Sequence, residues 1–229
     1  MRLFIHLLLL FPCLVLFSQE KEQVSPFTAV DSLYREDQFY FAVTYNSLQK
    51  TPAGFSQTGF STGVNLGFLR DMPINKSRTF AIAAGLGISY NNYRQNVVVM
   101  QNNGVTTYQI VGQNSFSKNK LEQVFAELPI EIRWRNSTPE SHRFWRIYTG
   151  FKISYLIYDK TKFVGNETII ITSNSDFNKI QYGPMISFGF NTWNLHGYYG
   201  LNPLFKSATI EDKRVDMRTL NLGLIFYIL

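Results

Sequence analysis

Residues 124–135 read VFAELPIEIRWR, and this short stretch decides the fold. Its even-numbered positions are all apolar and end in Trp134, whereas charge is confined to the odd-numbered positions. The charged residues are Glu127, Glu131, Arg133 and Arg135. Alternation of this kind indicates a β-strand with two different faces, because successive side chains point to opposite sides of a strand.

The same alternation recurs in seven further segments beyond Asp37. They cover residues 39–46, 60–68, 80–89, 145–157, 180–191, 194–202 and 220–228. One face of each segment is rich in Phe, Leu and Ile, while the other holds mostly small or polar residues. We therefore expect about eight strands of roughly 9 to 15 residues, a length that suits a tilted strand spanning a membrane.

The connections between these segments alternate in length. The short ones lie at 71–77, 136–142 and 192–193, and the longer ones at 49–56, 94–120, 160–178 and 206–214. This alternation is typical of an outer-membrane barrel with both termini in the periplasm. Within the longest connection, Asn102-Asn103-Gly104 is a turn signal that predicts a hairpin projecting above the membrane.

Two folds could produce this pattern. One is a soluble β-sandwich or lipocalin-like barrel with its apolar faces inward, but so many large side chains would overfill an eight-stranded interior. The other turns them toward lipid, which also places the aromatic residues at strand ends in a membrane girdle. We therefore predict an all-β protein, an eight-stranded antiparallel transmembrane outer-membrane β-barrel with up-and-down meander topology.

The N-terminal residues before this barrel lack the alternation of apolar and polar residues. A basic start, an apolar run from Leu3 to Phe17 and a small residue at Ser18 predict a secretory signal peptide over residues 1–18. A membrane anchor is the alternative, although the run is short for a spanning helix. Residues 19–36 form a polar periplasmic leader, and residues 37–229 the barrel. Cys13, the sole cysteine, is expected to leave with the signal peptide.

Composition excludes several classes of protein. A mean hydropathy of −0.09 does not fit a helical membrane protein, and the abundance of Phe and Ile does not fit a disordered chain. The formal net charge of +6 is scattered along the sequence. Without a stripe of Lys and Arg interleaved with aromatic residues, nucleic acid is not an expected partner.

The charged face of residues 124–135 predicts what fills the barrel. If Trp134 lies opposite Trp145 in a hairpin, cross-strand neighbours bring acids and bases within reach of one another. The expected lumen ion-pair network comprises Glu127, Glu131, Arg133, Arg146 and Lys152. Glu127 and Glu131 could instead act as a catalytic acid–base pair, but nothing else completes a reaction centre. We predict no enzyme activity, no cofactor, no metal and no small-molecule substrate.

The short connections carry a second group of charged residues. The expected periplasmic basic rim comprises Arg70, Lys76, Arg78, Arg135 and Arg143, with Asp71 and His142 beside them. Such a rim is either a solvated edge that meets the phosphates of outer-membrane lipid or a docking surface for a periplasmic protein.

Two blocks of sequence resemble the PorT family of outer-membrane barrels from the Bacteroidetes. They are residues 127–135, ELPIEIRWR, and 144–155, FWRIYTGFKISY; the leader at 31–40, DSLYREDQFY, is similar too. The resemblance implies an integral protein of the outer membrane with a role in the type IX secretion system, which in some species supports gliding motility. It implies no catalytic residues.

The resulting hypothesis is an accessory or assembly component of type IX protein secretion that acts through contacts with proteins of that machinery. The alternative is a stand-alone barrel, porin-like or adhesin-like, with no role in secretion.

Overall fold

The computed structural model describes residues 37–136 and 145–228. The predicted signal peptide (1–18) and leader (19–36) lie outside the described residues.

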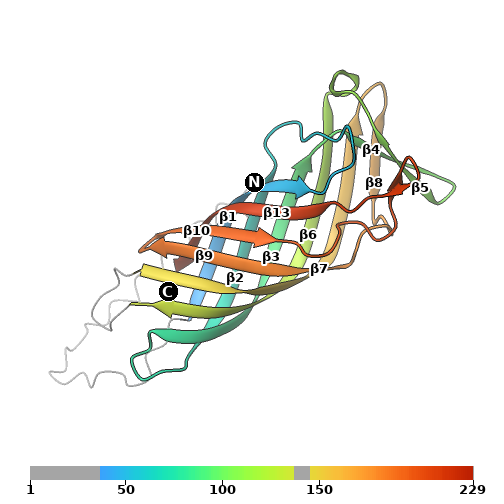
Figure 1. The fold of residues 1–229 in the computed structure, drawn as a ribbon. Coiled ribbons are helices and arrows are strands. Elements are labelled where there is room, and N and C mark those ends of the chain that lie inside the picture. The colour runs from blue at the N-terminus through green and yellow to red at the C-terminus, as the bar shows by residue number, and fades with distance from the viewer. Residues whose placement is uncertain (1–36, 137–144, 229) are drawn as a thin grey trace, which may run out of the picture. The chain divides into compact units, whose positions relative to one another are not determined.

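Eight strands close into a barrel in which every strand pairs with its neighbours in antiparallel fashion (Figure 1). They are β1 (Gln38–Gln49), β2 (Thr62–Pro73), β3 (Phe80–Arg94), β6 (Lys118–Arg135), β7 (Trp145–Val164), β9 (Ile180–Phe190), β10 (Trp193–Tyr199) and β13 (Arg218–Ile228). They follow one another around the barrel in chain order, and the pairings β6–β7 and β1–β13 leave no free edge between them. The predicted eight-stranded up-and-down barrel is confirmed.

The remaining elements lie in the longer connections. They are β4 (Val97–Asn102), β5 (Val105–Ile110), the 3-10 turn η1 (Gln113–Ser115), β8 (Thr168–Thr172), β11 (Thr209–Ile210) and β12 (Lys213–Arg214). We call this the long-connection end, and the opposite end the short-connection end. The predicted hairpin is confirmed as β4–β5: Asn103 and Gly104 both have positive φ, at 48° and 81°, as a two-residue type I′ turn requires.

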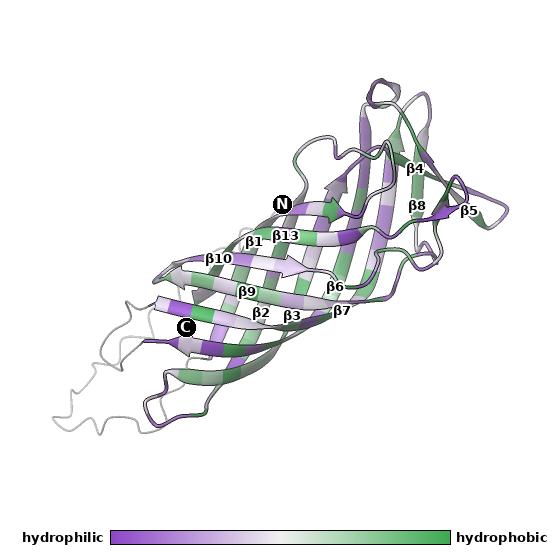
Figure 2. Cartoon of the chain, viewed as in Figure 1, coloured by the Kyte–Doolittle hydropathy of each residue, from purple (hydrophilic) through white to green (hydrophobic). Residues whose placement is uncertain are grey.

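The faces of the wall are those of a membrane barrel. Leu66, Ile130 and Phe188 point outward and remain 49%, 45% and 44% exposed, whereas inward-facing Asn46 and Asn65 are buried. Figure 2 shows the resulting bands of apolar and polar residues along the strands. An apolar exterior around a polar interior excludes the soluble barrel with its apolar faces inward. Within residues 37–136 and 145–228, no helix is long and apolar enough to cross a membrane.

Strands β6 and β7 are longer than predicted, with 18 and 20 residues. They continue beyond the apolar belt, which is the band of outward-facing apolar side chains such as Leu66, Ile130 and Phe188, toward the long-connection end. There the outward positions carry Lys120 and Glu122 on β6 and Lys160 on β7. A bulge at Val124/Phe125 leaves Ile157 as an extra residue in the β7 partner strand. A single extra residue shifts the alternation of all residues after it to the other parity.

The predicted register of the β6–β7 hairpin is wrong by two residues. Trp134 lies opposite Ile147 instead of Trp145, and Arg135 lies opposite Arg146. Asn136 is bonded to Trp145 on both sides in this register: its backbone N–H donates to Trp145 O at 3.2 Å, and its side chain accepts from Trp145 N at 2.7 Å. These bonds favour the observed register over the predicted one. A shift of two preserves the faces, so the predicted inward side chains remain inward.

Candidate functional site

Asp71 is the acid at the centre of the lumen near the short-connection end. It lies on the inner face of β2 with no exposed side-chain surface. Arg133 donates to its Oδ1 at 3.1 Å, and Arg135 donates to Oδ1 at 3.0 Å and to Oδ2 at 2.8 Å. One carboxylate therefore binds two guanidinium groups from β6, one of them in a bidentate manner.

Arg133 has further partners from three elements. Its Nε donates to Glu131 Oε2 at 2.8 Å. The guanidinium carbon lies 4.6 Å from the ring centroid of Tyr148 on β7 and 5.8 Å from that of Tyr227 on β13. The rings of Tyr148 and Tyr227 meet edge to face at 5.4 Å, and Arg146 lies within 6 Å of both centroids. Stacking on aromatic faces is a favourable environment for a desolvated guanidinium.

A second ion pair lies further along the lumen. Lys152 Nζ donates to Glu127 Oε1 at 2.8 Å, with both side chains almost fully buried. Lys152 stands diagonally from Glu127, because the residue opposite it on β6 is Pro129. Its ammonium also lies 4.3 Å from the ring centroid of Tyr198. The five residues expected in the lumen network therefore all lie inside the barrel, in two separate groups.

The short-connection end differs from the expected basic rim. Arg70 and Lys76 are exposed, and Arg78 is partly buried. Arg135, expected on the rim, lies inside the barrel with no exposed side-chain surface, because β6 extends far enough to bring it to Asp71. Arg143 lies outside the described residues.

Asp71 was missed as a lumen residue because the charged pair Arg70-Asp71 looks like the start of a turn. In the structure β2 continues to Pro73, so Asp71 retains the inward parity of Asn65 and Leu69. Two sequence signals could have found it. Asp71 continues the odd-numbered series of inward positions on this strand, and the predicted network contains more bases than acids.

The space around the Glu127–Lys152 pair is almost filled. Two cavities border the pair, of about 10 Å³ on the side of His196 and about 20 Å³ on the side of Asn221. Each holds no more than about one or two water molecules. His196 itself is buried, with its Nδ1 2.9 Å from Ser187 Oγ.

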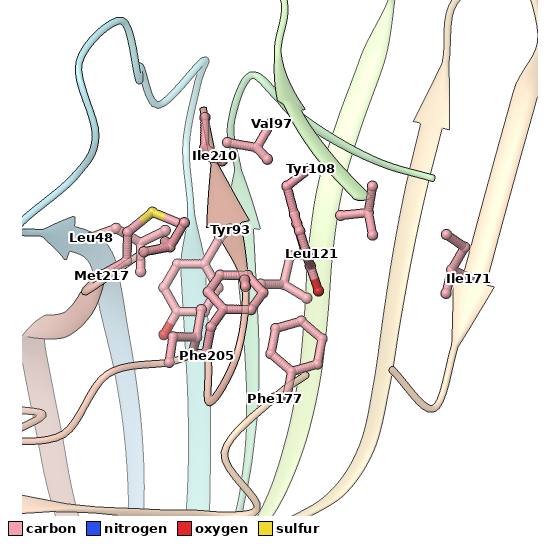
Figure 3. Packing of buried hydrophobic residues seen from close by; sticks show 14 of the residues in the cluster. Leu48, Tyr93, Val97, Tyr108, Leu121, Ile171, Phe177, Phe205, Ile210 and Met217 are labelled. Atoms are coloured by element: carbon pink, nitrogen blue, oxygen red, sulfur yellow. The ribbon is translucent and has the colours of Figure 1, made fainter. Parts of the chain in front are cut away.

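The long-connection end is closed by a hydrophobic cluster, which we call the loop cap (Figure 3). Its buried members are Leu48, Tyr93, Val97, Val99, Tyr108, Leu121, Phe125, Leu156, Ile171, Phe177, Leu204, Phe205, Ala208, Ile210, Val215 and Met217. Inward residues of the upper wall, such as Leu121, here meet residues of the connections, such as Phe205. The sequence did not predict this cap, since the connections have no periodicity that would reveal their packing.

Aromatic contacts and hydrogen bonds fix the connections to one another within the cap. Phe205 stacks on Phe177 at 4.8 Å between centroids and meets the edge of Tyr108 at 5.2 Å. The Tyr108 hydroxyl donates to Asp176 Oδ2 and accepts from Asn174 Nδ2, both at 2.8 Å. Burial raises the pKa of Tyr108; the hydrogen bond from Asn174 lowers it in part, and the bond to Asp176 raises it again.

The described residues contain no cluster of three or more His, Cys, Asp or Glu side chains that could hold a metal ion. Glu127 and Glu131, the acids considered for catalysis, are each bound to a base. Chemically, this arrangement is suited to filling and bracing the barrel.

Comparison with known proteins gives a family but no close relative. The family model described as outer membrane protein beta-barrel domain matches residues 17–206. No curated protein matches the sequence. The narrower resemblance to the PorT family stays a prediction.

Two solved structures are among those similar to the chain. One is Ail, the attachment invasion locus protein of Yersinia pestis, in complex with the heparin analogue sucrose octasulfate: 12% identity, 83% of this chain and 99% of that chain covered, TM-score 0.29. The other comes from a study of asymmetric conductivity of engineered proteins: 8% identity, 85% and 100% covered, TM-score 0.22. At these TM-scores neither likeness carries an argument about function.

Proposed function

The chain belongs to the family of outer membrane protein beta-barrel domains, and from this premise we propose that it is a sealed barrel of the outer membrane that acts by binding other proteins. Solutes do not pass through it, and it carries out no catalysis. Its working surfaces are then the two ends of the barrel, since the wall between them faces lipid.

The observation that carries this proposal is the filled lumen. The buried ion pairs occupy the interior toward the short-connection end, and the loop cap occupies the long-connection end. A conducting barrel needs a continuous polar path, and eight strands leave an interior only just wide enough for side chains. Planar-bilayer recording of the purified protein should show no stepwise conductance above that of the lipid; discrete channel openings would contradict the proposal.

We further propose that the process it serves is type IX protein secretion, as an accessory or assembly component. The support is the resemblance of residues 127–135 and 144–155 to the PorT family. The corresponding orientation places both termini and the short-connection end in the periplasm, which agrees with the usual placement of short turns in bacterial outer-membrane barrels. Exposed Arg70 and Lys76 would then face periplasmic partners of the secretion machinery.

A deletion strain tests this role. Loss of export of type IX cargo, with other outer-membrane proteins at normal levels and export restored by the wild-type gene, is the expected result. Normal export would eliminate the role.

An adhesin-like barrel is the second candidate. The observation that favours it is the large, ordered structure at the long-connection end, where three connections pack together in the loop cap. A strain that exports its cargo normally but no longer attaches to a surface or host matrix would favour this alternative.

A further inference from the structure

Beyond the apolar belt, the outward-facing side chains of three adjacent strands, β3, β6 and β7, are cations instead of apolar residues. On β3 the outward positions run from Tyr90, which is 39% exposed, to Arg94 four residues later, about 14 Å further along the strand. Pairing sets Arg94 beside Lys120 of β6, and Lys120 beside Lys162 of β7. Three cations thus follow one another around the wall, just beyond the lipid-facing surface.

A cavity of about 210 Å³ lies beside this row of cations. Its lining residues are Thr58, Arg94, Gln113, Phe116, Ser117, Lys118 and Asn119. Two of them, Arg94 and Lys118, are exposed cations. The side-chain donors of Gln113, Ser117 and Asn119 already donate to acceptors of the protein, so the two cations are the groups that can bind a ligand here. In the described part of the chain neither Arg94 nor Lys118 forms an ion pair with an acid.

The neighbouring cation, Lys120, differs from Arg94 and Lys118 because it is paired with an acid. Lys120 is bound to Glu122, and Tyr90 donates its hydroxyl to the same carboxylate oxygen at 2.6 Å. The pKa of Glu122, which lies above the belt, is lowered by Lys120 and Tyr90 against the opposing effect of burial. Glu122 is therefore already paired with Lys120, which leaves the charge of Arg94 and Lys118 available to a ligand.

The backbone around Arg94 holds its side chain at the cavity. Its N–H donates to Ser61 Oγ at 2.9 Å, and its C=O accepts from Thr58 N at 3.1 Å. Gly59 has a φ of 119°, and a Cβ there would come within 3.6 Å of Arg94 Cδ. The first long connection thus packs along the aliphatic stem of Arg94 in a conformation that suits glycine.

We propose that this cavity binds a phosphate group on the headgroup of a lipid in the outer leaflet, with Arg94 and Lys118 as its cationic ligands. A guanidinium matches a phosphate in a bidentate manner, and an ammonium adds a point charge. The occupant is a lipid because the cations stand on the outer wall, on the same strand faces that contact acyl chains below. The inference rests on the proposed function only for the orientation that places the long-connection end outside the cell.

Ligand binding to the purified mature protein in a neutral detergent tests the site. The probe is a glucosamine-based lipid carrying two phosphates, measured by native mass spectrometry, and the comparison probes are the same lipid without phosphates and inorganic phosphate alone. Arg94→Gln and Lys118→Gln should each weaken binding of the phosphorylated lipid about tenfold. Lys213→Gln, an exposed cation on β12, is the matched control and should bind as wild type.

Three outcomes would overturn the proposal. One is unchanged binding by the Arg94→Gln/Lys118→Gln double variant, provided that it keeps the heat-modifiable gel migration of a folded barrel. Another is equal binding of the lipid without phosphates. The third is inorganic phosphate binding as tightly as the lipid, which would identify a soluble anion as the ligand. The measurement uses purified protein, so its result is independent of any effect of deletion on type IX export.

Discussion

At the scale of single residues, Asp71 is the most consequential side chain of the lumen. Asp71→Ala would leave the guanidinium groups of Arg133 and Arg135 buried without their shared carboxylate. Removing one partner of a buried ion pair costs about 3–5 kcal/mol, and we expect a loss of at least this order in the free energy of unfolding. Urea unfolding in lipid vesicles, followed by tryptophan fluorescence, measures it.

The control for Asp71 is an exposed acid at the other end of the barrel. Glu167→Ala should leave the urea midpoint unchanged, because surface charges contribute little. If Asp71→Ala and Glu167→Ala unfolded at the same urea concentration, the central place of Asp71 in the network would be refuted.

The pair Glu127–Lys152 gives a second prediction at this scale. Glu127→Ala leaves the Lys152 ammonium buried without its carboxylate and should lower the stability by about 3–5 kcal/mol. Glu127→Gln keeps an oxygen acceptor at the same place and should cost less. The double variant Glu127→Leu/Lys152→Met removes both charges and should recover most of the loss. Additive effects of the two substitutions in a double-mutant cycle would argue against the pair.

Individual residues also show what the sequence could predict. The period of two assigned Glu127, Glu131 and Lys152 to the inner face, because parity depends on the strand alone. It did not reveal Asp71, since a charge after Arg70 looks like the end of a strand, and it placed Arg135 on the rim for the same reason. A charged residue next to a predicted turn can lie either on the rim or in the lumen, and the length of the strand decides between the two.

At the scale of the elements, Gly150 controls the approach of β7 to β6. A Cβ at Gly150 would lie 2.0 Å from Ile130 O and 2.8 Å from Glu131 Cα, both backbone atoms that cannot move aside cheaply. Gly150→Ala should therefore disturb the ladder that closes the barrel and reduce the yield of heat-modifiable, folded protein. At Gly197 of β10 a Cβ would meet side-chain atoms at 3.4 and 3.7 Å. Gly197→Ala should fold as wild type, and equal folding of both variants would contradict the argument.

The loop cap gives a further prediction for the elements. Phe205→Ala removes the ring that joins Phe177 to Tyr108, and loss of a buried Phe costs about 3–5 kcal/mol. The connections should open to trypsin near Lys206 and Lys179, while the membrane-embedded wall stays resistant. Val105→Ala at the exposed tip of the β4–β5 hairpin is the control. Unchanged proteolysis of Phe205→Ala would show that the cap does not hold the connections together.

Elements were predictable to different degrees. Eight strands, their order and the β4–β5 turn followed from alternation and from Asn103-Gly104, which are local signals. The register of β6 with β7 did not, because a shift of two residues leaves every face unchanged, and alternation alone therefore fits both registers. The cap depends on contacts between residues far apart in the chain, such as Tyr108 with Phe205, and no local pattern encodes them.

At the scale of the whole molecule, the barrel reverses the arrangement of a soluble protein: apolar side chains face lipid, and polar side chains face one another in the interior. In water the exposed rings and aliphatic chains of the wall would cost about 25 cal/mol for each Å² of apolar surface. In the hydrocarbon of a bilayer that cost disappears, while the paired charges inside are kept from lipid by the closed wall.

Nitroxide labels at adjacent positions test this inversion most directly. A chain that begins at residue 19 contains no cysteine, so single cysteines can be introduced in the pairs Val43/Thr44, Ile153/Ser154 and Phe188/Ser187. In a reconstituted bilayer, labels at Val43, Ile153 and Phe188 should collide freely with lipid-dissolved oxygen, and labels at the other three positions should be immobile and protected. Free oxygen collisions at Thr44, Ser154 and Ser187, with protection of their apolar neighbours, would contradict the account.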